Sequence, residues 1–174
     1  MSFSIVDNAD KYLRRLHKTL CDNALIEDPK DVRKLVKVHR DHNKEITGWE
    51  IRGKEITFNY SDYLDCDEYA SKGVKGQHII KEFSYHFKPT KKGGLLSFRI
   101  DLERKDLHFN PDPELEPGLK HRIPADKMPM NIENFNVLLA IHTANKYISS
   151  EVYPTDDNSG AYDKVLEPLR ELIR

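Results

Sequence analysis

Cysteine, tryptophan and the common cofactor motifs are scarce or missing in this chain of 174 residues. Its two cysteines, Cys21 and Cys66, fit neither the spacing of a zinc site nor that of a redox pair, so we expect free thiols in a reducing cytoplasm. No HxH, HExxH or CxxC pattern occurs, and neither does a P-loop or a GxGxxG loop. These absences give no support to metal, nucleoside-triphosphate or dinucleotide chemistry, and we expect no cofactor.

Long apolar runs and a charge excess of one sign are missing as well. No run approaches membrane-spanning length, and the first residues, MSFSIVDNADK, lack the basic flank and apolar core of a signal peptide. The net charge of −1 does not predict nucleic-acid binding, although it leaves room for a local basic patch. With 38% hydrophobic and 33% charged residues, we expect one domain over 1–174, with its core at about 6–150 and a helical extension at about 153–174.

What the chain does contain is a mixture of helical and alternating patterns. Apolar residues at helical spacing predict three helices, the first of them capped by Asp7 or Asn8. These helices cover about 8–23, 131–149 and 162–173. Alternating or β-branched stretches predict strands. These strands cover about 32–38, 45–51, 54–63, 79–87, 95–101 and 106–110.

The connections complete the predicted fold. Arg52-Gly53 indicates a hairpin, 64–76 indicates a loop, and the prolines of 111–129 indicate an irregular crossing. Pro168 should kink or shorten the last helix. We expect an α+β fold, in which the N-terminal helix and two C-terminal helices pack on the apolar face of a curved antiparallel sheet of about five to six strands.

The two faces of the central strands can be separated because side chains alternate along a strand. If 79–87, 95–101 and 106–110 pair as consecutive hairpins, Phe83 can lie opposite Ile100, and Ile100 opposite Leu107. Arg99 would then lie between its neighbours on the other two strands, Ser84 and His108. The polar side chains that this pairing collects on one face are Glu82, Ser84, His86, Ser97, Arg99, Asp101, His108 and Asn110.

These residue types suit metal-independent cleavage of RNA. Histidine moves protons at neutral pH, and arginine binds phosphate through two parallel hydrogen bonds. The candidate catalytic residues are His86, Arg99, Asp101, His108 and His121. In this scheme one histidine takes the proton of the 2′-hydroxyl, another protonates the leaving oxygen, and Asp101 or Glu82 orients a histidine. The candidate substrate-binding residues are Ser84, Lys120 and Arg122.

Three other interpretations of the same face stay open. A sheet face in contact with water is commonly polar for that reason alone. The protein could instead be a non-catalytic interaction module, such as an immunity or regulatory protein. A metal-dependent hydrolase is the third alternative, and its ligands would be His86, Asp101, His108 and His121.

Several short motifs resemble a known family. The order runs from a helix and a strand carrying GWEI through FNYSDY and FSYHF to a glycine turn, LSFRID and a later histidine beside a lysine. Over about residues 45–125 this is similar to the TumE-type toxins of bacterial and archaeal toxin–antitoxin pairs. Those proteins typically carry a tyrosine-histidine pair on one strand, an arginine and an aspartate on the next, and then a histidine-rich proline loop. Tyr85-His86, Arg99 and Asp101 match by position, and Lys120-His121 matches the later histidine.

The resemblance has departures and implications. After Asp101 the chain reads LERKDLHF where the family has asparagine-alanine-proline-histidine-histidine, and the later cluster has one histidine. The resemblance implies a growth-inhibiting toxin that acts in the cytoplasm on RNA or translation. It also implies a helix-turn-helix antitoxin as partner. A homodimer is a further expectation, and no membrane partner is expected.

Overall fold

The computed structural model describes residues 4–22, 32–58, 62–90, 94–115 and 122–174. Its helices are α1 (Ala9–Asp22), α2 (Val32–Leu35), α3 (Val137–Ser150) and α4 (Ala161–Ile173), with short 3-10 turns at Ala125–Lys127 and Pro154–Asp156. Its strands are β1 (Ser4–Val6), β2 (Lys37–Arg40), β3 (Ile46–Phe58), β4 (Asp62–Lys72), β5 (His78–Lys88), β6 (Phe98–Glu103), β7 (Asp106–Pro111) and β8 (Ile123–Pro124).

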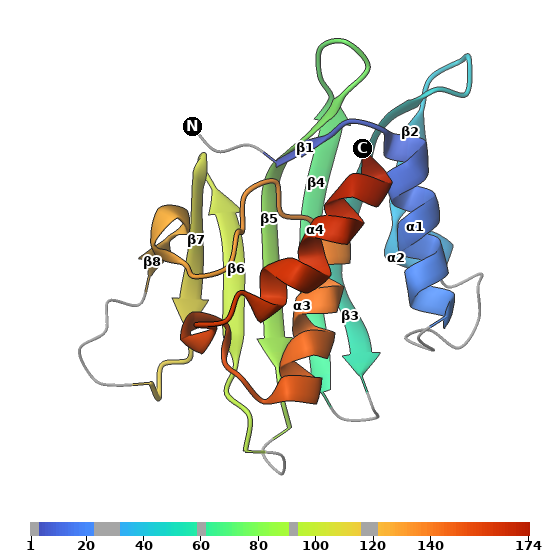
Figure 1. Cartoon of the computed structure of the whole chain (residues 1–174). Coiled ribbons are helices and arrows are strands. Elements are labelled where there is room, and N and C mark those ends of the chain that lie inside the picture. Colours follow the sequence, from blue (N-terminus) through green and yellow to red (C-terminus); the bar gives the residue numbers. More distant parts are fainter. Residues whose placement is uncertain (1–3, 23–31, 59–61, 91–93, 116–121) are drawn as a thin grey trace.

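The described strands form one open antiparallel sheet in the order β2-β3-β4-β5-β6-β7-β8, and β1 pairs with β5. Helices α1, α3 and α4 lie across one face of this sheet (Figure 1). The predicted α+β class and antiparallel sheet are therefore confirmed. The predicted count of five to six strands is too low, because the described part of the chain contributes eight. None of the described helices is long and apolar enough to cross a membrane.

Besides the short strands β1 and β8, the prediction missed β4, which occupies most of the segment expected to be a loop. Leu64, Cys66 and Ala70 alternate onto the buried face, while Asp65 and Asp67 lie on the other face. Acidic residues are depleted in strands, so their density in this segment indicated a loop. The segment is nevertheless a central strand, hydrogen-bonded to β3 on one side and β5 on the other.

The first half of the sheet also differs from prediction. Arg52-Gly53 forms no hairpin; it is a bulge inside the continuous strand β3, with Gly53 in the left-handed region at φ +52°. The stretch 32–38, predicted as a strand, is divided between α2 and β2. Tyr60, expected to share a face with Ile56 and Phe58, lies outside the described residues.

The helices begin where capping groups are present. Asn8 caps α1, since its Oδ1 accepts from Lys11 N at 3.0 Å, and Asn136 caps α3 in the same way through Leu139 N at 3.1 Å. Asp157 accepts from the backbone of Ala161 and Tyr162 at the start of α4. Pro168 lies inside α4, and the helix continues past it to Ile173.

A buried carboxylate ties the helical layer to the sheet. Glu68 of β4 is 2% exposed, and it accepts from the Tyr12 hydroxyl of α1 at 2.8 Å and from Val137 N, at the start of α3, at 2.9 Å. It also accepts from Trp49 Nε1 at 2.6 Å and the Tyr85 hydroxyl at 2.5 Å. Burial raises the pKa of the Glu68 carboxyl, and these donors oppose the rise. One side chain therefore joins two helices to three strands.

The pairing of β5, β6 and β7 has the predicted faces but a different register. Tyr85 lies opposite Ile100, and Ile100 opposite Phe109, so both registers are displaced by two residues from prediction. A displacement of two keeps every side chain on its predicted face. It changes the neighbours, however: Arg99 lies between His86 and Asn110, and not between Ser84 and His108.

Candidate functional site

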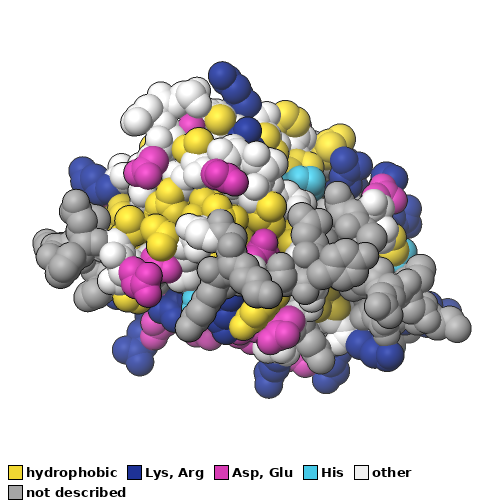
Figure 2. All heavy atoms as spheres, turned by 90° about the horizontal axis from the view of Figure 1, so that it is seen from below, with side chains coloured by type: hydrophobic (Ala, Val, Ile, Leu, Met, Phe, Trp, Pro, Cys, Tyr) yellow, Lys and Arg dark blue, Asp and Glu magenta, His cyan; other side chains and the backbone are white. Residues whose placement is uncertain are grey.

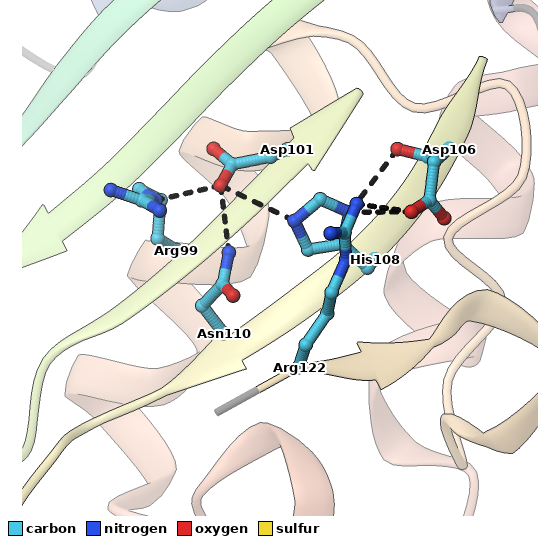
Figure 3. A network of polar contacts seen from close by, with 6 residues as sticks. All are labelled: Arg99, Asp101, Asp106, His108, Asn110 and Arg122. Carbon is cyan, nitrogen blue, oxygen red and sulfur yellow. Dashed lines mark hydrogen bonds and ion pairs between the residues drawn. The ribbon is translucent and has the colours of Figure 1, made fainter. Parts of the chain in front are cut away.

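The sheet face opposite the helices, here called the polar face, carries a network centred on Asp101 of β6 (Figure 3). Its Oδ2 accepts from Arg99 Nε at 2.7 Å and from Asn110 Nδ2 at 2.7 Å. Arg99 is two residues away on the same strand, and Asn110 comes from β7. Asp101 is 7% exposed, whereas the Arg99 side chain is 47% exposed. A buried carboxylate thus fixes one end of an accessible guanidinium.

The terminal nitrogens of Arg99 are left for a ligand. Only Nε contacts Asp101, and neither Nη atom has a hydrogen-bond or ion-pair partner among the described residues. Arginine presents its donors in a rigid planar fork that matches two oxygens of a phosphate or carboxylate. Because the Nε contact with Asp101 restrains the rotation of that fork, the site is partly organised before any ligand binds.

His86 of β5 lies directly across from Arg99. It is half-buried, and its strand partner on the other side is Asp65 of β4. Burial lowers the pKa of His86 below its ordinary value, the cations of Lys88 and Arg99 lower it further, and the Asp65 and Asp101 carboxylates act in the opposite direction. The ring is therefore neutral at pH 7 and able to accept a proton.

His108 is placed differently from the prediction. It is 4% exposed, its Nδ1 lies 3.1 Å from the Asp106 carbonyl oxygen, and its Nε2 lies 3.6 Å from Asp101 Oδ2. The carbonyl can only accept, so Nδ1 carries a proton. Arg122, which pairs with the Asp106 carboxylate, lies beside the ring (Figure 3). His108 therefore adjoins the network at Asp101, and its ring is too buried to exchange protons with a substrate.

Two clefts adjoin at Arg99, which contributes to the lining of both. The first, here called the His86 cleft, has a volume of about 370 Å³. Its lining residues are His86, Ser97, Phe98, Arg99, Asn110, Pro111 and Pro113. The second, here called the acidic cleft, has a volume of about 530 Å³. Its lining residues are Ile51, Arg52, Asp67, Glu68, Tyr69, Glu82, Phe83, Ser84, Arg99, Asp101, Leu102 and Glu103.

The predicted site residues separate into four groups, one of which is the pair His108 and Arg122 beside Asp106. His86, Arg99 and Asp101 come together on the polar face, with Arg99 as the link between the clefts. Ser84, predicted to bind substrate in the same place, lines only the acidic cleft. Lys120 and His121 lie outside the described residues.

Sequence reasoning missed the role of several side chains. Asn110 was placed on the correct face, but its bond to Asp101 depends on a register that turn lengths alone do not determine. Asp67 and Tyr69 line the acidic cleft from β4, which was not predicted as a strand. The only signal for them was the alternation of Leu64, Cys66 and Ala70, which Glu68 interrupts.

Charge on this surface is mixed. The acidic cleft is lined by more carboxylates than guanidinium groups. The His86 cleft is lined by one arginine, Arg99, and by no carboxylate. The end of the molecule in Figure 2 carries Lys and Arg side chains spread around its outline, with Asp and Glu between them. An extended basic stripe, the usual footprint of a protein that binds long nucleic acids, is not visible among the described residues at this end.

Metal chemistry has little support in the described ranges. They contain no group of three or more His, Cys, Asp or Glu side chains arranged to hold a metal ion. Of the four ligands considered above, Asp101 and His108 are adjacent, and His121 is outside the description. The cysteines are free thiols, Cys66 buried and Cys21 partly exposed.

Comparisons with known proteins leave the chain without an assigned family. No protein-family model, no curated protein and no solved structure matches it.

Proposed function

We propose that this protein is a toxin-like ribonuclease that cleaves RNA in the His86 cleft without a metal ion. The observation that carries the proposal is the juxtaposition of a partly buried histidine, His86, with an arginine, Arg99, that lines the same cleft and whose Nη atoms have no partner among the described residues. RNA cleavage by its own 2′-hydroxyl needs a base beside that hydroxyl and positive charge beside the phosphate. His86 and Arg99 supply these two groups.

The reaction follows from this placement. His86 accepts the 2′-hydroxyl proton as the oxygen attacks phosphorus, and Arg99 compensates the charge that develops on the non-bridging oxygens. The bond to the 5′-oxygen breaks, and that oxygen takes up a proton, which leaves a 2′,3′-cyclic phosphate and a 5′-hydroxyl. Asp101 acts through Arg99 as a positioning residue, because its Oδ2 accepts from Arg99 Nε and so restrains the guanidinium.

A different account of the leaving group replaces the predicted histidine pair. His108 is too buried to protonate the 5′-oxygen, and His121 stays a candidate outside the described residues. Protonated His86 can return its proton to that oxygen. The His86 ring would then act first as the general base and afterwards as the general acid.

Expression in cells tests the toxin part of the proposal. We expect the native protein to slow growth and degrade cellular RNA, and both His86→Gln and Arg99→Lys to restore growth. Lysine keeps the charge but loses the planar fork. Exposed residues of the same types provide controls, and His42→Gln and Arg14→Lys should stay as toxic as the native protein. Equal growth for all five proteins, measured at equal expression, would contradict the proposal.

A non-catalytic interaction module is the second candidate. It is favoured by the burial of His108, which leaves His86 as the one histidine that lines either cleft among the described residues. This alternative predicts intact RNA and a partner that co-purifies in a fixed ratio.

A further inference from the structure

The acidic cleft carries more negative charge than its own cations neutralise. Asp67 of β4 accepts a hydrogen bond from Gly53 N at 2.7 Å, and neither it, Glu82 nor Glu103 forms an ion pair within the described part of the chain. Arg52 also borders the cleft but pairs with Glu50 at 3.1 Å. The cleft therefore holds three carboxylates, one each from β4, β5 and β6, that have no ion-pair partner among the described residues.

A second observation is a buried carboxylate oxygen that has no hydrogen-bond donor. Asp101 lines this cleft and is 93% buried, since its exposed fraction is 7%. Its Oδ2 is fully engaged, yet its Oδ1 is buried and has no hydrogen-bond partner among the described residues. A buried carboxylate oxygen without a donor costs free energy, and a ligand N–H at this position would recover it.

The one exposed aromatic residue of the lining indicates which kind of cation fits. Tyr69 is 43% exposed, lies opposite Glu82 across the β4–β5 pair, and lines the cleft together with Asp67 of its own strand. Aromatic rings attract ammonium and guanidinium groups, and apolar surface suits the methylene stems that carry them. A bare metal ion would make no use of this part of the cleft.

We propose that the acidic cleft binds an alkyl guanidinium or ammonium group, as presented by a basic segment of a protein partner or by a free polyamine. The carboxylates of Asp67, Glu82 and Glu103 attract the cation, the Tyr69 side chain packs against its stem, and Asp101 Oδ1 accepts a hydrogen bond from it. This site does not depend on RNA cleavage. It does adjoin Arg99, so a ligand there lies beside the His86 cleft.

Titration of the full chain with two defined probes tests this site. The first is a fluorescent hexapeptide of alternating glycine and arginine, with a citrulline version as the uncharged control, and the second is spermine. Glu82→Gln combined with Glu103→Gln should weaken binding of the cationic probe about five- to tenfold, as expected for the loss of two exposed ion pairs. Tyr69→Leu should also weaken it. Glu55→Gln, an exposed neutralisation on β3 outside the cleft lining, should change the affinity less than about twofold.

The outcomes separate the sources and the alternatives. Binding of the arginine peptide but not spermine assigns the site to a protein segment, and the reverse assigns it to a polyamine; either supports the site. Equal weakening by Glu55→Gln, or equal binding of the citrulline peptide, would overturn it. A short RNA oligonucleotide provides the last comparison. If the double variant weakened RNA binding, the cleft would be a nucleobase pocket and the cation site would be wrong, whereas RNA cleavage in the His86 cleft would be untouched.

Discussion

At the scale of single residues, Asp101 decides how the candidate site works. It is the acceptor that fixes Arg99 and Asn110, and its burial makes those contacts stronger than they would be in water. Arg99 is thereby held where the two clefts adjoin, one of which His86 lines. The residue types of the site could be predicted from the sequence, because alternation within each strand places His86, Arg99 and Asp101 on the same face of the sheet. The burial of His108 could not, because the two-residue strand β8, which the sequence does not indicate, pairs with β7 at this position.

The protonation of His86 gives a residue-level prediction. Its pKa should lie below that of a solvent-exposed histidine, chiefly because burial disfavours the charged ring. Arg99→Gln should raise this pKa, since a nearby cation is removed, and Asp65→Asn should lower it, since a nearby anion is removed. Titration of the ring proton resonances by NMR measures all three values.

The control for that titration is Arg52→Gln, which removes an equal charge away from the His86 cleft. It should leave the pKa of His86 near its native value. Shifts of the same sign in the Arg99 and Asp65 variants would contradict the placement of His86 between an arginine and an aspartate.

At the scale of elements, the faces of the sheet could be predicted while its register could not. Alternation has a period of two in any strand, so parity places side chains correctly even when the pairing is displaced by two residues. The displacement arises in the turns. The β6–β7 connection is a tight turn in which Arg104 and Lys105 both have positive φ, at 50° and 68°. Arginine and lysine are not residues that indicate such a turn, so a longer turn was expected.

The strand β4 was missed for a related reason. Glu68 interrupts the apolar alternation of its buried face, and its hydrogen-bond donors come from segments as far away as Tyr12 and Val137. A buried acid is stable only when such partners are present, and sequence patterns do not reveal them. One unrecognised tertiary network therefore made a central strand look like a loop.

Glu68 also gives a prediction about how the elements hold together. Its two oxygens each face an obligate N–H donor, Trp49 Nε1 at one and Val137 N at the other. In Glu68→Gln the new amide NH₂ must face one of these donors, so we expect a loss of about 2–4 kcal/mol in the free energy of unfolding. Urea denaturation measures it.

Comparison variants separate this network from general damage. Tyr85→Phe removes one donor and keeps the carboxylate, so it should cost about 1 kcal/mol. Glu55→Gln changes an exposed carboxylate of β3 and should have little effect. If Glu68→Gln were no less stable than Glu55→Gln, Glu68 would not link the helices to the sheet as described.

At the scale of the whole molecule, the two faces of the sheet have separate tasks. Helices α1, α3 and α4 cover the apolar face (Figure 1), and the residues of the candidate site line clefts on the polar face. The covered face contains Phe83, Tyr85 and Phe87, and the intervening residues Ser84 and His86 reach the open side. The rigidity of the packed face thus positions the candidate site, and the two adjoining clefts could serve a phosphate and a cation side by side.

The most direct test of the ribonuclease proposal is cleavage of a defined RNA oligonucleotide by the purified protein in the presence of EDTA. We expect products ending in 2′,3′-cyclic phosphate, with a rate that falls as the pH is lowered through the pKa of His86, because protonation removes the base. His86→Gln should lower the rate about 100-fold or more, and Arg99→Lys about tenfold or more, while His42→Gln leaves it unchanged. A native protein that cleaves no RNA, or a His86→Gln variant as active as the native protein, would contradict the account.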